Sequence, residues 1–213
     1  MRSSWLAFLF VALAVPATAQ EPVNVPSEPA SAQAPALSSE SFLSRGTTEW
    51  MIGVGPAWGL VLFHSAGGHK YVLQTISWGR VLTEPHGPAP LRGRFELAFE
   101  VAPVYAQYDP RKTYGFGVTP LLWRWNFEPR GKIATYAELA GGGLWTRDAV
   151  PERTTTSNFT AHASYGVRYF LSPHRAINVA YRFHHISNGN RLERNPGVNA
   201  HVLMLGISVI QPR

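Results

Sequence analysis

Residues 175–188 read RAINVAYRFHHISN. Side chains alternate between the two faces of a β-strand, so every second residue of this stretch shares a face. One face is an apolar stripe that ends in a base and a hydroxyl: Ile177, Val179, Tyr181, Phe183, His185 and Ser187. The other face is mostly small and polar: Ala176, Asn178, Ala180, Arg182, His184 and Ile186. This alternation is typical of a membrane β-strand, and a lipid-facing His and Ser suggest a substrate that is itself a lipid.

The same period-two pattern recurs along the chain in segments separated by Gly, Pro, Asn and charged residues. We expect eight strands, at residues 48–58, 70–83, 92–104, 113–127, 132–146, 156–171, 175–187 and 198–210. The predicted fold class is therefore all-β, an eight-stranded antiparallel outer-membrane β-barrel. A soluble lipocalin-like barrel or a β-sandwich is the alternative.

Charged residues favour the membrane barrel over the soluble one. Glu96, Glu100, Glu138, Arg124 and Arg168 fall on the face opposite the large apolar side chains. Charges of both signs on one face suit a polar lumen, where they pair with one another. Aromatic residues gather towards the strand ends, as an interfacial girdle requires: Trp50, Trp58, Trp78, Trp123, Trp125, Trp145 and Tyr169.

Two segments precede the predicted barrel. Residues 1–19 have a charged start, a short apolar core and an Ala-Thr-Ala cleavage site, which together predict a secretory signal peptide. Residues 20–45 are rich in Pro, Ala and Ser, and we expect a disordered spacer there, followed by the barrel domain at 46–213. Export through a cleaved signal places the expected barrel in the cell outer membrane.

Composition excludes several classes of function. The chain has no cysteine, which excludes disulfides, a cysteine nucleophile and a cysteine metal site. The net charge is +6, but the basic residues are scattered, and an exported chain is not expected to bind nucleic acid. The sequence leaves the oligomeric state open between a monomer and a homodimer.

Loop lengths predict the orientation of the barrel. Outer-membrane barrels have short periplasmic turns and longer outer loops, and the joints at 128–131 and 172–174 are short. The joint at 188–197 then falls outside, which puts His185 and Ser187 near the outer leaflet. In a Gram-negative cell that leaflet is lipopolysaccharide.

Ser187 and His185 are candidates for a nucleophile and its base, because serine needs a neighbouring group to take its proton. The last strand returns beside the previous one, so Asn199 is expected to approach His185 and to orient its ring. His201, on the same face, and Glu193, in the loop, are alternative orienting residues. Adjacent histidines of one strand point to opposite faces, so we expect no metal to be held by His184 and His185 together.

At this point the sequence resembles a known family. His185-Ile186-Ser187-Asn188, followed by Asn195-Pro196-Gly197-Val198-Asn199, is similar to the C-terminal hairpin of the lipid A 3-O-deacylase (PagL) family, also called acyloxyacyl hydrolases. The resemblance implies an outer-membrane serine esterase that removes the ester-linked 3-O acyl chain of lipid A without a cofactor.

The resemblance also implies residue roles. Ser187 is the expected nucleophile and His185 the expected base, while Asn188 and Asn195 are expected to form or support the oxyanion site. Asn199 stands where the family carries an acidic residue, so this chain departs from the family pattern there. Arg191 and Arg194 are either substrate-binding residues that meet the lipid A phosphates or ordinary solvated loop charges.

Two further readings remain open. A non-enzymatic or inactive structural barrel is favoured by the missing acidic partner and by a last strand that lacks a terminal aromatic residue. A soluble periplasmic lipid carrier is the third possibility. The sequence alone also leaves the acyl-chain preference undetermined.

Overall fold

The computed structural model describes residues 42–62 and 64–213. The predicted signal peptide and most of the predicted spacer lie outside these residues. Within the described residues, no helix is both long enough and apolar enough to cross a membrane.

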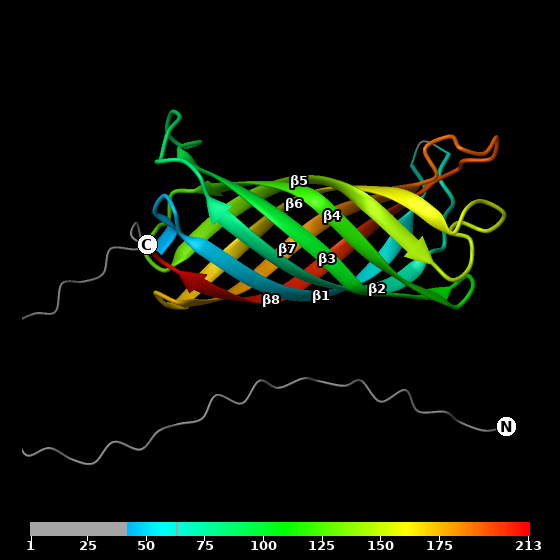
Figure 1. Cartoon of the computed structure of the whole chain (residues 1–213), viewed down its shortest axis with the longest axis horizontal. Helices are drawn as coiled ribbons and strands as arrows, with labels where there is room; N and C mark the ends of the chain where they lie inside the picture. Colours follow the sequence, from blue (N-terminus) through cyan, green and yellow to red (C-terminus); the bar gives the residue numbers. More distant parts are fainter. Residues whose placement is uncertain (1–41, 63) are drawn as a thin grey trace, which may run out of the picture. The chain divides into compact units, whose positions relative to one another are not determined.

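Eight antiparallel strands close into one barrel in which each strand pairs with its neighbours in sequence and the last pairs with the first (Figure 1). The strands are β1 (Thr48–Leu60), β2 (Lys70–Val81), β3 (Gly93–Asp109), β4 (Thr113–Phe127), β5 (Ile133–Thr146), β6 (Ser157–Ser172), β7 (Arg175–Ser187) and β8 (Val198–Gln211). The predicted fold class is confirmed. Closure leaves no unpaired strand edge, as a membrane demands.

Strand β3 extends beyond its predicted end at residue 104. The pairing of β3 with β4 shifts register between Ala102 and Tyr105, and the alternation of buried and exposed residues changes phase there. A bulge of this kind adds a residue to one strand and interrupts the period-two pattern. Sequence alternation therefore stops at the bulge, although the strand continues to Asp109.

Large apolar side chains cover the outside of the barrel, and charged side chains fill its middle. Arg124 lies at the centre of the lumen, where it donates to Glu138 at 2.7 Å, Glu96 at 2.6 Å and Glu49 at 3.0 Å. Arg182 donates to both carboxylate oxygens of Glu100 at 2.9 Å. The predicted face assignment is confirmed, because buried charges are tolerated only when they pair.

Apolar residues close both ends of the lumen. Tyr71, Tyr105, Ile186 and Val198 belong to a buried cluster at one end. At the other end Phe42 and Leu43, which precede β1, pack against Phe170, Ala134, Ala176 and Ile210. Side chains from the segment before residue 46 thus take part in the barrel core.

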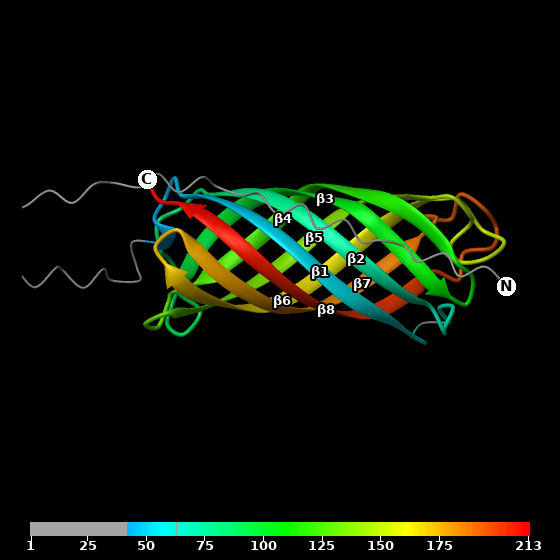
Figure 2. The same ribbon diagram turned by 90° about the horizontal axis from the view of Figure 1, so that it is seen from below.

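The two ends of the barrel carry different loops (Figure 2). One end, called the site end because it carries His185 and Ser187, has the joints at 61–69, 110–112, 147–156 and 188–197. The other end, called the terminal end because β1 starts and β8 ends there, has the joints at 82–92, 128–132 and 173–174. The start of β1 and the end of β8 both lie at the terminal end (Figure 1). His185 and Ser187 lie at the site end of β7.

Candidate active site

The outer wall of β7 carries the predicted nucleophile and base. Burial alternates strictly along β7. The side chains buried in the lumen are those of Ala176, Asn178, Ala180, Arg182, His184 and Ile186, and the residues between them lie on the outside. His185 and Ser187 are half-buried on the outer wall, next to Phe183. The predicted face of these two residues is confirmed.

Asn199 lies directly opposite His185 in the pairing of β7 with β8. The Nδ1 atom of His185 is 2.7 Å from the Oδ1 atom of Asn199. Directly opposed residues of antiparallel strands bring their side chains within contact distance, which explains the pairing. The structure thus brings together His185 and its predicted orienting residue.

A backbone carbonyl fixes which way the Asn199 amide points. The Nδ2 atom of Asn199 donates to the carbonyl oxygen of Leu62 at 3.0 Å. Only the amide nitrogen can donate to a carbonyl, so the amide oxygen faces His185. In the neutral ring of His185 the proton then lies on Nδ1, and Nε2 carries the lone pair.

The loop around Ser65 holds Leu62 in place. The hydroxyl of Ser65 donates to the carbonyl of Leu60 at 3.0 Å and accepts from the N–H of Leu62 at 3.1 Å. The N–H of Ala66 donates to the carbonyl of Gly197 at 2.9 Å, which joins this loop to the β7–β8 hairpin. Sequence reasoning missed Leu62, because a backbone carbonyl in a loop leaves no signal in residue types.

Gly197 gives the imidazole of His185 room. A Cβ atom at this position would lie 3.1 Å from Cε1 of His185 and 3.2 Å from the carbonyl oxygen of Ile186. Its φ of +65° is also a left-handed conformation that side chains disfavour. A glycine is therefore required beside the ring.

Ser187 is close to His185 but is not bonded to it. The two residues are two apart on one strand face, so their Cα atoms are about 7 Å apart. The hydrogen bonds of the described chain include none between Ser187 Oγ and His185. Catalytic hydrogen bonds are often long until substrate binds, so this spacing suits a serine and its base.

The predicted oxyanion residues hold one another in the loop that follows Ser187. Asn188 is 1% exposed, and its N–H donates to Oδ1 of Asn195 at 3.1 Å. Its Nδ2 atom donates to the carbonyl of Arg194 at 2.9 Å, while Nδ2 of Asn195 donates to Oδ1 of Asn190 at 2.9 Å. The structure brings Asn188 and Asn195 together, and their role at an oxyanion stays a prediction.

Arg191 contacts the protein itself. Its Nε atom donates to the carbonyl of Asn188 at 2.9 Å, and its two terminal nitrogens donate to the hydroxyl and the carbonyl of Ser157. Its guanidinium also lies 5.1 Å from the ring centre of Phe159. These contacts tie the loop after Ser187 to β6. They favour a positioning role over the predicted phosphate contact, whereas the side chain of Arg194 is exposed in the loop.

The alternative orienting residues lie elsewhere. Nδ1 of His201 is 2.5 Å from the hydroxyl of Tyr181 on the outer wall. Glu193, the other alternative, is exposed in the loop. His184, the neighbour of His185 in sequence, points into the lumen, where its Nδ1 is 2.7 Å from the hydroxyl of Tyr71. Of the candidates, Asn199 is the one that contacts His185.

A shallow hollow of about 510 Å³ opens on the outer wall beside His185. Gly141 pairs with Ala161 and Ala161 pairs with His185, so two small residues lie in the row that leads to the histidine. The lining is largely apolar: Pro120, Leu121, Trp123, Leu139, Ala140, Gly141, Ala161, His162, Ala163, Phe183 and His185. Gly141 has no side chain to fill this hollow, and a Cβ atom there would meet only the carbonyl oxygen of Thr160, at 3.8 Å.

Fold and site together define an eight-stranded outer-membrane β-barrel with a paired histidine on its outer wall. The sequence model of lipid A 3-O-deacylase (PagL) matches residues 73–208. The chain therefore belongs to the lipid A 3-O-deacylase (PagL) family. No curated protein matches the chain at a significant level.

Solved structures support the same fold. Neisserial surface protein A (NspA) is 16% identical with a TM-score of 0.53, and the match covers 78% of this chain and 99% of that one. The outer membrane enzyme PagL is 13% identical with a TM-score of 0.52, and the match covers 74% of this chain and 97% of that one. At these identities the likeness concerns the fold alone.

Proposed function

We propose that this protein is a serine esterase that removes the ester-linked 3-O acyl chain of lipid A in the outer leaflet of the outer membrane. Family membership supports the substrate class. The observation that carries the mechanism is the pairing of His185 with Asn199, whose amide is oriented by the carbonyl of Leu62.

Ser187 attacks the ester carbonyl, and Nε2 of His185 takes the hydroxyl proton. The tetrahedral intermediate collapses when His185 returns that proton to the leaving sugar oxygen, which leaves the fatty acyl group on Ser187. Water then attacks the acyl-enzyme with His185 as base. The second collapse releases the fatty acid and restores the serine.

Asn199 supports this cycle without a charge. The amide oxygen holds the proton of His185 on Nδ1, so that Nε2 is available as the base in every turnover. The charge of a carboxylate would further stabilise the imidazolium, and that contribution is absent here. We therefore expect a working but slower enzyme than one with an acidic residue at this position.

The loop after Ser187 is the proposed source of oxyanion donors. Gly189 and Asn190 both have positive φ, at 63° and 59°, so the backbone turns sharply next to the nucleophile. Asn188, Asn195 and Arg191 hold that turn through the hydrogen bonds described above. Backbone N–H groups fixed in this way can face a developing oxyanion without reorganising.

The hollow beside His185 suits an acyl chain. Its apolar lining opens towards the surrounding lipid, and it ends at the histidine that would act on the ester. A chain lying over Gly141 and Ala161 would present its ester carbonyl at the level of His185. This arrangement lets a lipid substrate react without leaving the membrane.

The test is to express the full chain in bacteria whose outer membrane contains lipid A, and to measure the mass of the extracted lipid A by mass spectrometry. We expect the loss of one acyl chain with the natural protein and full-mass lipid A with Ser187→Ala or His185→Ala. Ser172→Ala, at the other end of the barrel, is the matched control and should behave like the natural protein. Full-mass lipid A with the folded natural protein would contradict the proposal and favour a non-enzymatic barrel.

A further inference from the structure

The outer wall near the terminal end is layered. Strand pairing places the residues of β8, β1 and β2 in common rows around the barrel. Successive rows, moving towards the terminal end, are Ile207, Ile52 and Ile76; then Val209, Trp50 and Trp78; then Gln211, Thr48 and Arg80. A change from aliphatic to tryptophan to polar side chains marks the passage from lipid hydrocarbon to headgroups.

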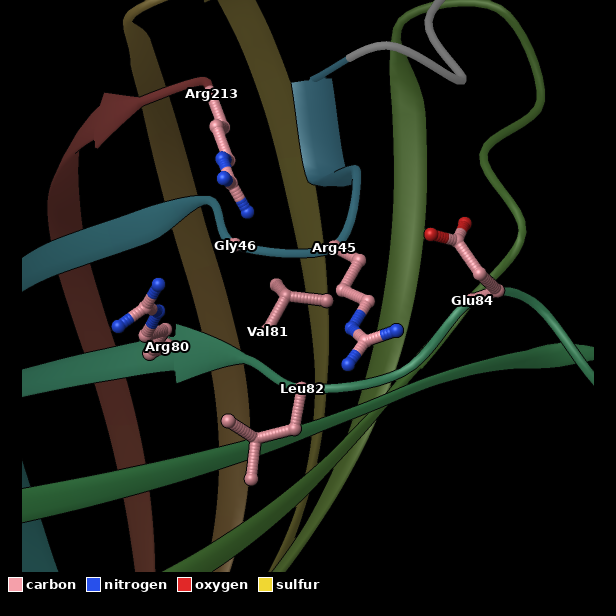
Figure 3. A pocket seen from close by; sticks show the side chains of 7 residues that line it. All are labelled: Arg45, Gly46, Arg80, Val81, Leu82, Glu84 and Arg213. Carbon is pink, nitrogen blue, oxygen red and sulfur yellow. The ribbon is translucent and has the colours of Figure 1, made fainter.

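Three arginines lie at this polar level and surround one hollow (Figure 3). Arg45 comes from the segment before β1, Arg80 from the end of β2 and Arg213 from the residues after β8. The hollow has a volume of about 540 Å³ and is called the arginine hollow below. Its lining residues are Arg45, Gly46, Arg80, Val81, Leu82, Glu84 and Arg213.

Gly46 leaves room for the side chain of Arg213 beside the hollow. A Cβ atom at Gly46 would lie 2.8 Å from Cδ of Arg213, and the φ of this glycine is +92°. The aliphatic stem of Arg213 therefore packs against bare backbone. A larger residue would push it away from the hollow.

The positive charge of the arginine hollow is not neutralised by the protein. Within residues 42–62 and 64–213, the ion pairs include none made by Arg45, Arg80 or Arg213. Glu84 contributes one carboxylate to the lining, against three guanidinium groups. In the lumen, by contrast, Arg124 forms ion pairs with three carboxylates.

We propose that the arginine hollow binds the headgroup phosphate of an anionic glycerophospholipid in the inner leaflet of the outer membrane. Guanidinium groups bind phosphate oxygens in a bidentate manner, and three arginines line this hollow. The tryptophan row places the hollow at headgroup depth, and exposed Leu82 at its rim offers contact to the acyl chains. The site lies at the opposite end of the barrel from His185, so it stands independently of the proposed esterase.

The experiment is native mass spectrometry of the full-length protein in detergent, titrated with dioleoylphosphatidylglycerol. The triple variant Arg45→Gln, Arg80→Gln and Arg213→Gln should bind this lipid on the order of 100-fold more weakly, since each basic residue near a membrane surface contributes about a fivefold effect. The matched control carries Arg130→Gln, Lys132→Gln and Arg175→Gln. It loses the same charge at the same end, and it should bind as the natural protein does.

Three outcomes would overturn the proposal. Equal weakening in the triple variant and its control would show a general charge effect. Equal binding of dioleoylglycerol, which has no phosphate, would show that the headgroup is not recognised. Displacement of the lipid by millimolar inorganic phosphate would indicate a free-anion site. If the triple variant does not fold, Arg80→Gln alone should still weaken lipid binding about fivefold.

Discussion

Residue 199 is an amide where the resemblance to the family predicts a carboxylate, and the hydrogen bonds around Asn199 decide what it can do. In serine proteases an Asp-to-Asn change at the equivalent role costs about 10⁴ in rate, largely because the histidine adopts the wrong tautomer. Here the carbonyl of Leu62 accepts from Asn199 Nδ2 at 3.0 Å, so the amide oxygen faces His185. The correct tautomer is therefore built into the fold without a charge.

Asn199→Leu should lower kcat by about 10³- to 10⁴-fold, because the leucine cannot accept the Nδ1 proton of His185. Asn199→Asp should keep more activity than Asn199→Leu, since a carboxylate accepts that proton. The aspartate would lose the hydrogen bond to the Leu62 carbonyl, because an ionised carboxylate has no proton to donate. Lipid A mass spectrometry over a time course measures both rates.

His201→Gln is the matched control for this pair. His201 lies two residues from Asn199 and is bonded to Tyr181, so its replacement should change kcat by less than about twofold. An unchanged kcat in Asn199→Leu would mean that Asn199 does not orient the base. A large loss in His201→Gln would mean that His201 does.

At the scale of strands, small residues of β5 and β6 shape the hollow beside His185. Ala161→Leu should fill it, because residue 161 lies between Gly141 and His185 in the strand pairing. We expect kcat/KM for lipid A to fall by at least roughly 10- to 200-fold, the range for a single methylene in an apolar pocket. Hydrolysis of a short p-nitrophenyl ester should stay unchanged, because a short chain does not reach the filled region.

Val179→Leu serves as the control for this prediction. It enlarges an exposed outer-wall residue of β7 that does not line the hollow, so both substrates should react as with the natural protein. A parallel loss of both substrates in Ala161→Leu would mean that the substitution disturbs His185 itself and that the hollow does not select long chains.

Strand alternation explains how much of this was predictable from sequence. All eight strands follow from the period-two pattern, because one face meets lipid and the other a polar lumen. The end of β3 was missed, because the bulge after Ala102 changes the phase. The contact between His185 and Asn199 is predictable because β8 runs antiparallel beside β7. The contact of Asn199 with the Leu62 carbonyl and the contacts of Arg191 depend on loop conformations that residue types do not specify.

At the scale of the whole molecule, the buried charge network links β4 to its neighbours β3 and β5, and through Glu49 it also joins β1 to β4 and β6, which are not its neighbours. Arg124 of β4 binds Glu49 of β1, Glu96 of β3 and Glu138 of β5, and Glu49 also binds Arg168 of β6 at 2.6 Å. The bonds of Glu49 cross the lumen, so they add to the strand pairing that closes the barrel. Removal of one partner leaves uncompensated buried charges, which is the costly way to break such a network.

Arg124→Met should therefore lower the free energy of unfolding by about 3–5 kcal/mol, since three buried carboxylates lose their common partner. The measurement is urea unfolding in detergent, followed by the shift between folded and unfolded bands on a gel. Arg92→Gln, which removes the surface pair with Glu128 at 3.1 Å, should cost no more than about 1 kcal/mol. Equal effects of the two variants would mean that strand closure alone sets the stability and that the network contributes little.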